Sequence, residues 1–253
     1  MKVDVVVLAG GDGAVIDPSC RFKGLVGVSG RPMIEWVVDG IRQAELVEGV
    51  AVVVPTAEDL GAWVDKVDKL VVSDGRIAEN VLAGIRSFKV DRPVLIVTGD
   101  IPTIDGGALD DFLSRSLATG ADFVYPIIPK DDMLSQYPEG ERTFVRLKEG
   151  RVTGGNMMLV NPALVERNVR IGQGLFDARK SPFGMVRMLG APFIARFLLG
   201  TLDRASLEQK MTEMLGGSGR AVVSHFGSIG MDVDKPSDLA VAEGILGSPP
   251  PVE

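Results

Sequence analysis

The chain has 253 residues, of which 45% are hydrophobic and 24% charged, and its net charge is −7. This balance is typical of a folded globular protein and excludes a disordered polar chain, and the negative charge disfavours non-specific binding to nucleic acid. One cysteine excludes an intramolecular disulfide, and one histidine argues against a histidine-rich zinc site.

The N-terminus enters an apolar run without a basic segment or cleavage site, so we expect no signal peptide and a cytoplasmic location. No apolar stretch reaches the roughly 18–20 residues that a membrane-spanning helix needs.

In the first half of the chain, apolar runs rich in β-branched residues alternate with segments of helical periodicity. Strands are expected at 3–8, 49–54, 69–72, 93–97 and 121–128, and helices at 33–44, 57–67, 76–88 and 104–118. Regular β-then-α order favours right-handed crossovers and a mainly parallel sheet with helices on both faces. We therefore predict an α/β fold, a Rossmann-like three-layer sandwich.

The regular order ends near residue 129. An exposed loop is expected at 129–142, strands at 144–147 and 157–160 around a hairpin-like turn at 148–151, and several short helices at 163–215. A strand at 221–226 and a helix at 236–245 close the chain. We predict an α/β core of residues 1–128 and 220–245, a mostly helical insertion at 129–219, and a flexible tail at 246–253.

The first strand ends in a glycine-rich loop, Ala9-Gly10-Gly11-Asp12-Gly13, and the cations Arg21 and Lys23 follow. Glycine lets backbone N–H groups approach phosphates closely, and lysine and arginine neutralise phosphate charge. The loop therefore predicts a nucleoside triphosphate site. Neither a G-x-x-x-x-G-K-[ST] nor a G-x-G-x-x-G motif is present here, which disfavours P-loop NTPases and dinucleotide-dependent dehydrogenases.

Acidic residues follow two other expected strands. Asp100 comes after the run at 93–97, and Asp232 and Asp234 come after the run at 221–226. One aspartate at a strand end is as often a helix cap or loop former as a ligand. Ligands collect at the carboxyl ends of strands in such sheets, however, and Mg²⁺ takes oxygen ligands while bridging to phosphates. Together these residues predict a Mg²⁺ site beside the glycine loop.

Four motifs occur in a characteristic order: Leu8-Ala9-Gly10-Gly11, Lys23 leading into Val28–Ile34, Gly99-Asp100-Ile101-Pro102, and Asp232–Leu239. This set resembles the nucleotidyltransferase superfamily with the glycosyltransferase-A-type fold. The first half is most similar to its molybdenum-cofactor guanylyltransferase-like (MobA-like) NTP transferases. The resemblance covers about residues 1–128 and 220–245, and it makes that core nucleotide-binding and the segment 129–219 acceptor-side.

The resemblance implies a role for each matching residue. Base and phosphates would contact Leu8, Ala9, Gly10 and Gly11, and the nucleoside would contact Asn80. Lys23, Arg21 and Asp100 would be catalytic, Asp100, Asp234 and Asp232 would hold Mg²⁺, and Gly155 and Asn156 would face the acceptor. The family's usual arginine follows the double glycine within a few residues, whereas Arg21 lies next to Lys23.

These features predict a Mg²⁺-dependent nucleotidylyltransferase that moves an NMP from an NTP to a small phosphorylated acceptor and releases pyrophosphate. One alternative is a glycosyltransferase that uses a nucleotide sugar; the absence of a D-x-D sequence at Asp100 disfavours it. Another is a non-catalytic nucleotide-binding protein. The base, the acceptor and the oligomeric state stay open.

The apolar segment Phe183–Leu199 contains Arg187 and Arg196. Core packing is the favoured interpretation, and contact with a membrane surface or a lipid phosphate is a minority alternative. We expect His225 to be structural and Cys20 not to be a nucleophile.

Overall fold

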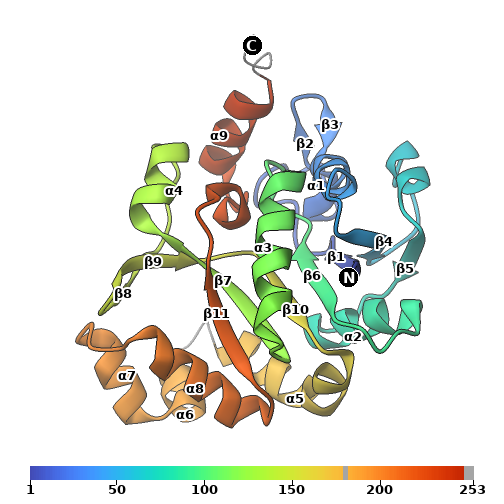
Figure 1. Ribbon diagram of the computed structural model, residues 1–253. Coiled ribbons are helices and arrows are strands. Elements are labelled where there is room, and N and C mark those ends of the chain that lie inside the picture. Colours follow the sequence, from blue (N-terminus) through green and yellow to red (C-terminus); the bar gives the residue numbers. More distant parts are fainter. Residues whose placement is uncertain (179–181, 248–253) are drawn as a thin grey trace.

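A mixed β-sheet forms the centre of the computed structural model, which describes the backbone of residues 1–178 and 182–247 and the side chains of 1–178 and 186–247 (Figure 1). The sheet contains β1 (Val3–Leu8), β4 (Val47–Val54), β5 (Lys69–Val72), β6 (Val94–Thr98), β7 (Phe123–Pro129), β8 (Val145–Leu147), β9 (Gly150–Gly154), β10 (Met157–Val160) and β11 (Gly219–Val223). A separate hairpin joins β2 (Gly27–Val28) to β3 (Arg31–Pro32).

The strands β5, β4, β1 and β6 are parallel neighbours, and β10 lies antiparallel between β6 and β7. On its other side, β7 pairs in parallel with β11. The hairpin β8–β9 continues along β7 beyond β10. The sheet is therefore mainly parallel, as the sequence predicts.

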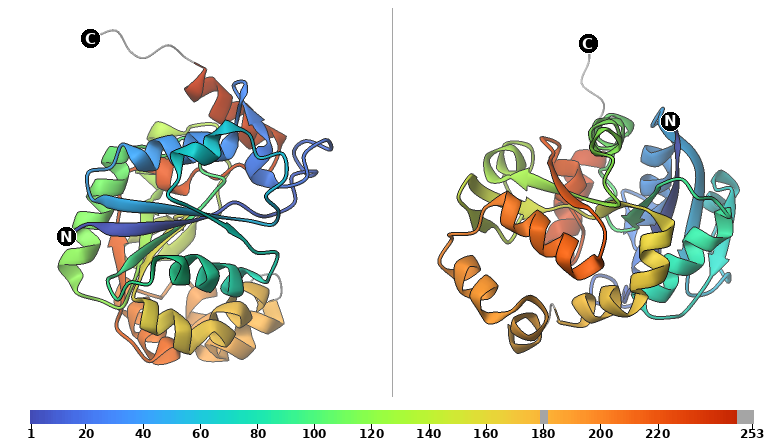
Figure 2. Two further views of the ribbon diagram at one scale, coloured as in Figure 1. Left: turned by 90° about the vertical axis from the view of Figure 1, so that its right-hand side faces the viewer. Right: turned by 60° about the horizontal axis from the view of Figure 1, so that its bottom comes forward.

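The helices are α1 (Met33–Arg42), α2 (Ile77–Phe88), α3 (Gly106–Thr119), α4 (Lys130–Gln136), α5 (Pro162–Ala178), α6 (Pro182–Leu189), α7 (Ala191–Leu198), α8 (Arg204–Leu215) and α9 (Pro236–Leu246). Short 3-10 helices are η1 (Lys23–Leu25), η2 (Ala62–Lys66) and η3 (Gly227–Gly230). Helices cover both faces of the sheet (Figure 2).

Alternate residues of β1 explain the three layers. Val5 and Val7 pack in the core that includes α1 and α3, whereas Val6 packs in the core that includes Ile85 of α2 and Val165 of α5. All three valines are fully buried. A strand that is apolar on both faces is typical of a parallel sheet between two helical layers.

Two local predictions are wrong and a third is incomplete. The expected helix at 57–67 is only the short η2, because Gly61 before it has φ +83°, outside the helical range. The expected loop at 129–142 contains α4, which buries Met133. The hairpin turn expected at 148–151 is confirmed, but it joins β8 to β9, a strand that the sequence does not predict.

Residues 129–219 contribute both helices and sheet. β8, β9 and β10 lie in this segment and pair within the central sheet, and the remainder holds α5 to α8. The division into an α/β core and an insertion therefore stays a prediction. The C-terminal residues 248–253 of the predicted tail lie outside the described residues.

Among the described helices, none is long and apolar enough to cross a membrane. At the end of α7, the side chains of Leu198 and Leu199 are 77% and 73% exposed, so this part of the segment Phe183–Leu199 is not core. The side chain of Phe183 lies outside the described residues.

Candidate functional site

The carboxyl ends of β1 and β6 meet beside the loop that precedes α9. Backbone hydrogen bonds hold them together: the Gly99 amide donates to the Leu8 carbonyl, and the Val233 amide donates to the Asp100 carbonyl, both at 2.9 Å. Residues that are far apart in the sequence thus form one edge of a cavity.

The glycine loop forms one wall of this cavity, which has a volume of about 430 Å³. Leu8, Gly10 and Gly11 line it, whereas Ala9 is buried behind them. Gly11 has φ +95°, a conformation that glycine adopts without strain. Its carbonyl accepts a hydrogen bond from the Lys23 amide at 3.0 Å, which fixes the loop against η1.

Arg21 and Lys23 have different surroundings, and Phe22 between them is buried in the core. Lys23 lines the cavity. Arg21 does not line it; its guanidinium pairs with Glu58 at 3.2 Å, and both side chains are exposed. The structure therefore brings Lys23 to the site and leaves Arg21 outside it.

Asn80 forms the opposite wall together with the loop after β5. Its Oδ1 accepts from the Ser73 hydroxyl at 2.7 Å and from the Gly75 amide at 3.1 Å, and its Nδ2 donates to the Gly75 carbonyl at 3.1 Å. Asn80 therefore holds the loop in shape as well as lining the cavity.

Three carboxylates converge at one end of the cavity. Ligand oxygens of Asp100, Asp232 and Asp234 all lie within 4.8 Å of one another. Lys23 Nζ donates to Asp100 Oδ2 at 2.5 Å and also to Asp234 Oδ1. Asp100 Oδ1 is buried without a hydrogen-bond partner among the described residues. The carboxylates fit a divalent cation, which would satisfy that oxygen.

Two residues that sequence reasoning missed support these carboxylates. Arg142 pairs with Asp232 Oδ1 at 3.1 Å and donates to the Asp232 carbonyl, with only 10% of its side chain exposed. Buried Asp238 accepts from the Asp234 amide at 3.0 Å. Arg142 lies in an irregular segment without a motif, whereas Asp238, in the first turn of α9, lies within the motif Asp232–Leu239.

Burial and neighbouring charges shift the pKa values here. Burial lowers the pKa of Lys23. The negative charge of Asp100 and the hydrogen bonds that Lys23 donates to Asp100 and Asp234 raise this pKa by more than burial lowers it, so the pKa lies above its usual value. Burial raises the pKa of Asp232 to about 6, although Arg142 acts in the opposite direction. Burial also raises the pKa of Asp234, but the hydrogen bond from Lys23 and the positive charges of Lys23 and Arg142 together outweigh burial, so this pKa is lowered.

Gly155 and Asn156 lie at a β-bulge between β9 and β10. Gly154 pairs with Ile127 of β7, and Leu159 pairs with Val124 of β7. Gly154 and Leu159 are five residues apart, whereas their partners on β7 are three residues apart, so the segment between β9 and β10 contains two extra residues. Bulges of this kind re-aim side chains beside active sites. Asn156 lines the cavity, and Gly155 lines adjoining spaces.

His225 and Cys20, which we expect to have no catalytic role, lie apart from the carboxylates. His225 is largely exposed and its Nδ1 lies 2.7 Å from Asp132 on α4. Burial raises the pKa of the Cys20 thiol, which disfavours the nucleophilic thiolate.

A family model described as the MobA-like NTP transferase domain matches residues 5–221. A 3-deoxy-manno-octulosonate cytidylyltransferase from Bdellovibrio bacteriovorus is 25% identical over 258 residues, covering 91% of this chain and 94% of the relative.

Solved structures share the fold over nearly the whole chain. A hypothetical transferase from Thermus thermophilus has a TM-score of 0.83 and 32% identity, covering 94% of this chain and 100% of its own. CMP:2-keto-3-deoxy-manno-octonic acid synthetase in complex with CTP has a TM-score of 0.62 and 14% identity, with coverages of 98% and 99%. A 2-C-methyl-D-erythritol 4-phosphate cytidylyltransferase, also from Thermus thermophilus, has a TM-score of 0.56 and 17% identity, with coverages of 98% and 100%.

Proposed function

The chain belongs to the family of MobA-like NTP transferase domains and is a nucleotidyltransferase, and on this premise we propose that it moves an NMP group from an NTP to a phosphorylated acceptor, with release of pyrophosphate. One observation carries the proposal. Lys23 and three carboxylates converge at the cavity that the glycine loop forms.

The shape of the cavity supports one orientation of the nucleotide. The backbone at Gly10 and Gly11 would face the phosphates, and the loop held by Asn80 would face the base. CTP is the first nucleotide to test, because the names of the Bdellovibrio relative and of two neighbours include cytidylyltransferase or CTP.

We propose that Asp100, Asp232 and Asp234 hold Mg²⁺. The buried, unpartnered Asp100 Oδ1 and the spacing of the three carboxylates support this assignment. Mg²⁺ bound there would neutralise phosphate charge and hold the phosphate oxygens. Lys23 is the only cation among the described residues that line the cavity, and release from its two carboxylates would let it pair with a phosphate.

The acceptor needs no general base, because a phosphate monoester with a second pKa of about 6 is largely dianionic at neutral pH. Its oxygen forms a bond to the α-phosphorus of the NTP. The bond from that phosphorus to the bridging oxygen breaks, and pyrophosphate leaves with the electron pair. Lys23 would offset the charge on the phosphates, and the cavity walls would align the reactants.

A thermal-shift panel of CTP, GTP, ATP and UTP with Mg²⁺, followed by pyrophosphate-release assays with sugar and alkyl phosphates, tests the proposal. We expect one NTP to stabilise the protein and pyrophosphate to appear only when an acceptor is added. Stabilisation by a nucleotide sugar but by no NTP would instead favour a glycosyltransferase. NTP binding without pyrophosphate release from any acceptor would favour a non-catalytic nucleotide-binding protein.

A further inference from the structure

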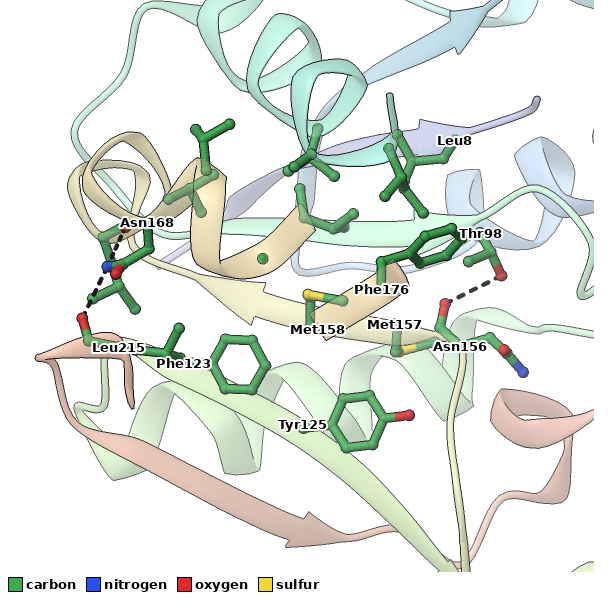
Figure 3. A pocket seen from close by; sticks show the side chains of 18 of the residues that line it. Leu8, Thr98, Phe123, Tyr125, Asn156, Met157, Met158, Asn168, Phe176 and Leu215 are labelled. Carbon is green, nitrogen blue, oxygen red and sulfur yellow. Dashed lines mark hydrogen bonds between the residues drawn. The ribbon is translucent and has the colours of Figure 1, made fainter. Parts of the chain in front are cut away.

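An apolar chamber lies next to the nucleotide cavity, between the sheet and the helices α2 and α5 (Figure 3). Its volume is about 310 Å³, at the lower end of the range for small-molecule sites. No charged residue occurs among the described residues that line it. Its apolar walls include Phe123, Met158, Leu164, Val165, Val169 and Leu215.

The chamber adjoins the nucleotide cavity. Five residues line both spaces: Leu8, Ile77, Thr98, Asn156 and Phe176. Figure 3 shows Thr98 and Asn156 together at one end of the chamber and Asn168 with Leu215 at the other. A ligand that occupies both spaces would therefore pass these five residues on its way to the carboxylates.

A third, polar cavity of about 490 Å³ lies on the other side of the same junction. Asp232, Asp234 and Arg142 line it. Asn156 lines all three spaces, and Tyr125 lines the chamber and the polar cavity. A ligand at this junction thus meets charged groups on one side and apolar walls on the other.

The hydrogen-bond donors on the few polar side chains of the chamber already have partners. Asn168 Nδ2 donates to the carbonyls of Leu164 and Leu215 at 2.9 and 2.8 Å. The Tyr125 hydroxyl donates to the Gly155 carbonyl at 2.7 Å, and Thr98 Oγ1 and Asn156 Nδ2 each donate to a carbonyl at 3.4 Å. A polar ligand entering the chamber would lose its hydration and would have to displace one of these carbonyls to accept a hydrogen bond, whereas an apolar ligand would be stabilised.

We propose that the acceptor is an amphiphilic phosphate, whose phosphate lies beside the Mg²⁺ that the three carboxylates would hold and whose apolar substituent fills the chamber. This inference rests on the proposed nucleotidyl transfer. It narrows the acceptor from any phosphorylated small molecule to one with an apolar alkyl or isoprenoid-like group.

The test uses Mg²⁺ and a series of monomeric n-alkyl phosphates, from ethyl to hexyl, titrated into the full-length protein by calorimetry. Each methylene buried in the chamber should tighten binding by about fourfold. Gly172 lines the chamber, and a Cβ added there meets no atom of the described residues within 4 Å, so we expect Gly172→Leu to add apolar volume at the chamber without a clash. This variant should lose the dependence on chain length, and Gly172→Ala should lose part of it.

Gly244→Leu is the matched control, because Gly244 lies in α9 outside the chamber and a Cβ added there also meets no atom of the described residues within 4 Å. It should keep the full dependence on chain length. Circular dichroism and the CTP thermal shift verify that each variant is folded. Affinity that does not change with chain length in the unaltered protein, or that changes equally in Gly172→Leu, would overturn the chamber assignment.

The two proposals fail differently. Pyrophosphate release with polar acceptors, but no dependence on chain length, would retain nucleotidyl transfer and reject the chamber. Binding of alkyl phosphates that depends on chain length, without binding of any NTP, would retain the chamber and reject nucleotidyl transfer. Sedimentation with phosphatidic-acid vesicles separates a membrane lipid from a free amphiphile: binding to vesicles alone, equal in Gly172→Leu, would indicate a surface contact and also reject the chamber.

Discussion

Asp232→Asn tests how the fold balances charge at the three carboxylates. Burial raises the pKa of Asp232 from 3.8 to about 6. This rise corresponds to about 3 kcal/mol at neutral pH, since one pKa unit is worth about 1.36 kcal/mol. A carboxyl group with a raised pKa binds its proton more tightly in the folded protein. Its ionisation therefore lowers the free energy of unfolding as the pH rises from about 4 to 6.

We expect Asp232→Asn to stabilise the metal-free protein by about 1–3 kcal/mol at pH 7.5. The lower value allows for the lost ion pair with Arg142, which keeps its bond to the main-chain carbonyl of residue 232. At pH 4.5 the gain should be smaller by about 2 kcal/mol, because the carboxyl group is then protonated in the folded protein.

Urea unfolding in EDTA, followed by circular dichroism at both pH values, measures this effect. Asp234→Asn is the control with the opposite sign: Lys23 lowers the pKa of Asp234, so removing its charge should destabilise the protein at pH 7.5. A loss of stability in Asp232→Asn at pH 7.5, or a gain that is equal at both pH values, would refute the reasoning.

Asp100→Ala should abolish pyrophosphate release and the thermal shift with Mg²⁺, while its circular dichroism stays unchanged; full activity would remove Asp100 from the metal site. Lys23→Ala should lower kcat/KM by about 100-fold or more in pyrophosphate-release assays, since no other lysine or arginine lies among the described residues that line the cavity. Arg21→Ala should lower it by less than about threefold, because its exposed ion pair contributes little; a loss like that of Lys23 would restore the phosphate role that the sequence predicts. Gly84→Ala should reduce the free energy of unfolding by about 1–3 kcal/mol, because its Cβ would lie 2.3 Å from Val6 Cγ1; an unchanged urea midpoint would show that α2 can shift.

The sequence predicts the core elements well where one physical signal dominates. Apolar, β-branched runs such as Val3–Leu8 identify the buried strands, because this composition suits a strand that is buried on both faces. Short elements depend on competing signals. η2 has helical periodicity but follows Gly61, and α4 is polar except for Met133, which is buried, and Leu134. Local patterns do not resolve such competition.

Sheet order and side-chain direction are set by contacts between distant residues, so the sequence leaves them open. No local signal shows that β10 lies between β6 and β7. Proximity in sequence suggests that Arg21 acts with Lys23, but in the folded chain Arg21 pairs with Glu58. The pairing of Arg142 with Asp232 likewise depends on the folded chain.

The central position of β10 has a consequence for synthesis. Val97 of β6 pairs with Met157 of β10, so one edge of β6 has no strand to pair with until the ribosome has added about 60 more residues. At about 5–20 residues per second this takes roughly 3–12 s. During that time an apolar strand edge is open to other nascent chains, which makes this interval the point at which chaperones would most affect the yield of folded protein.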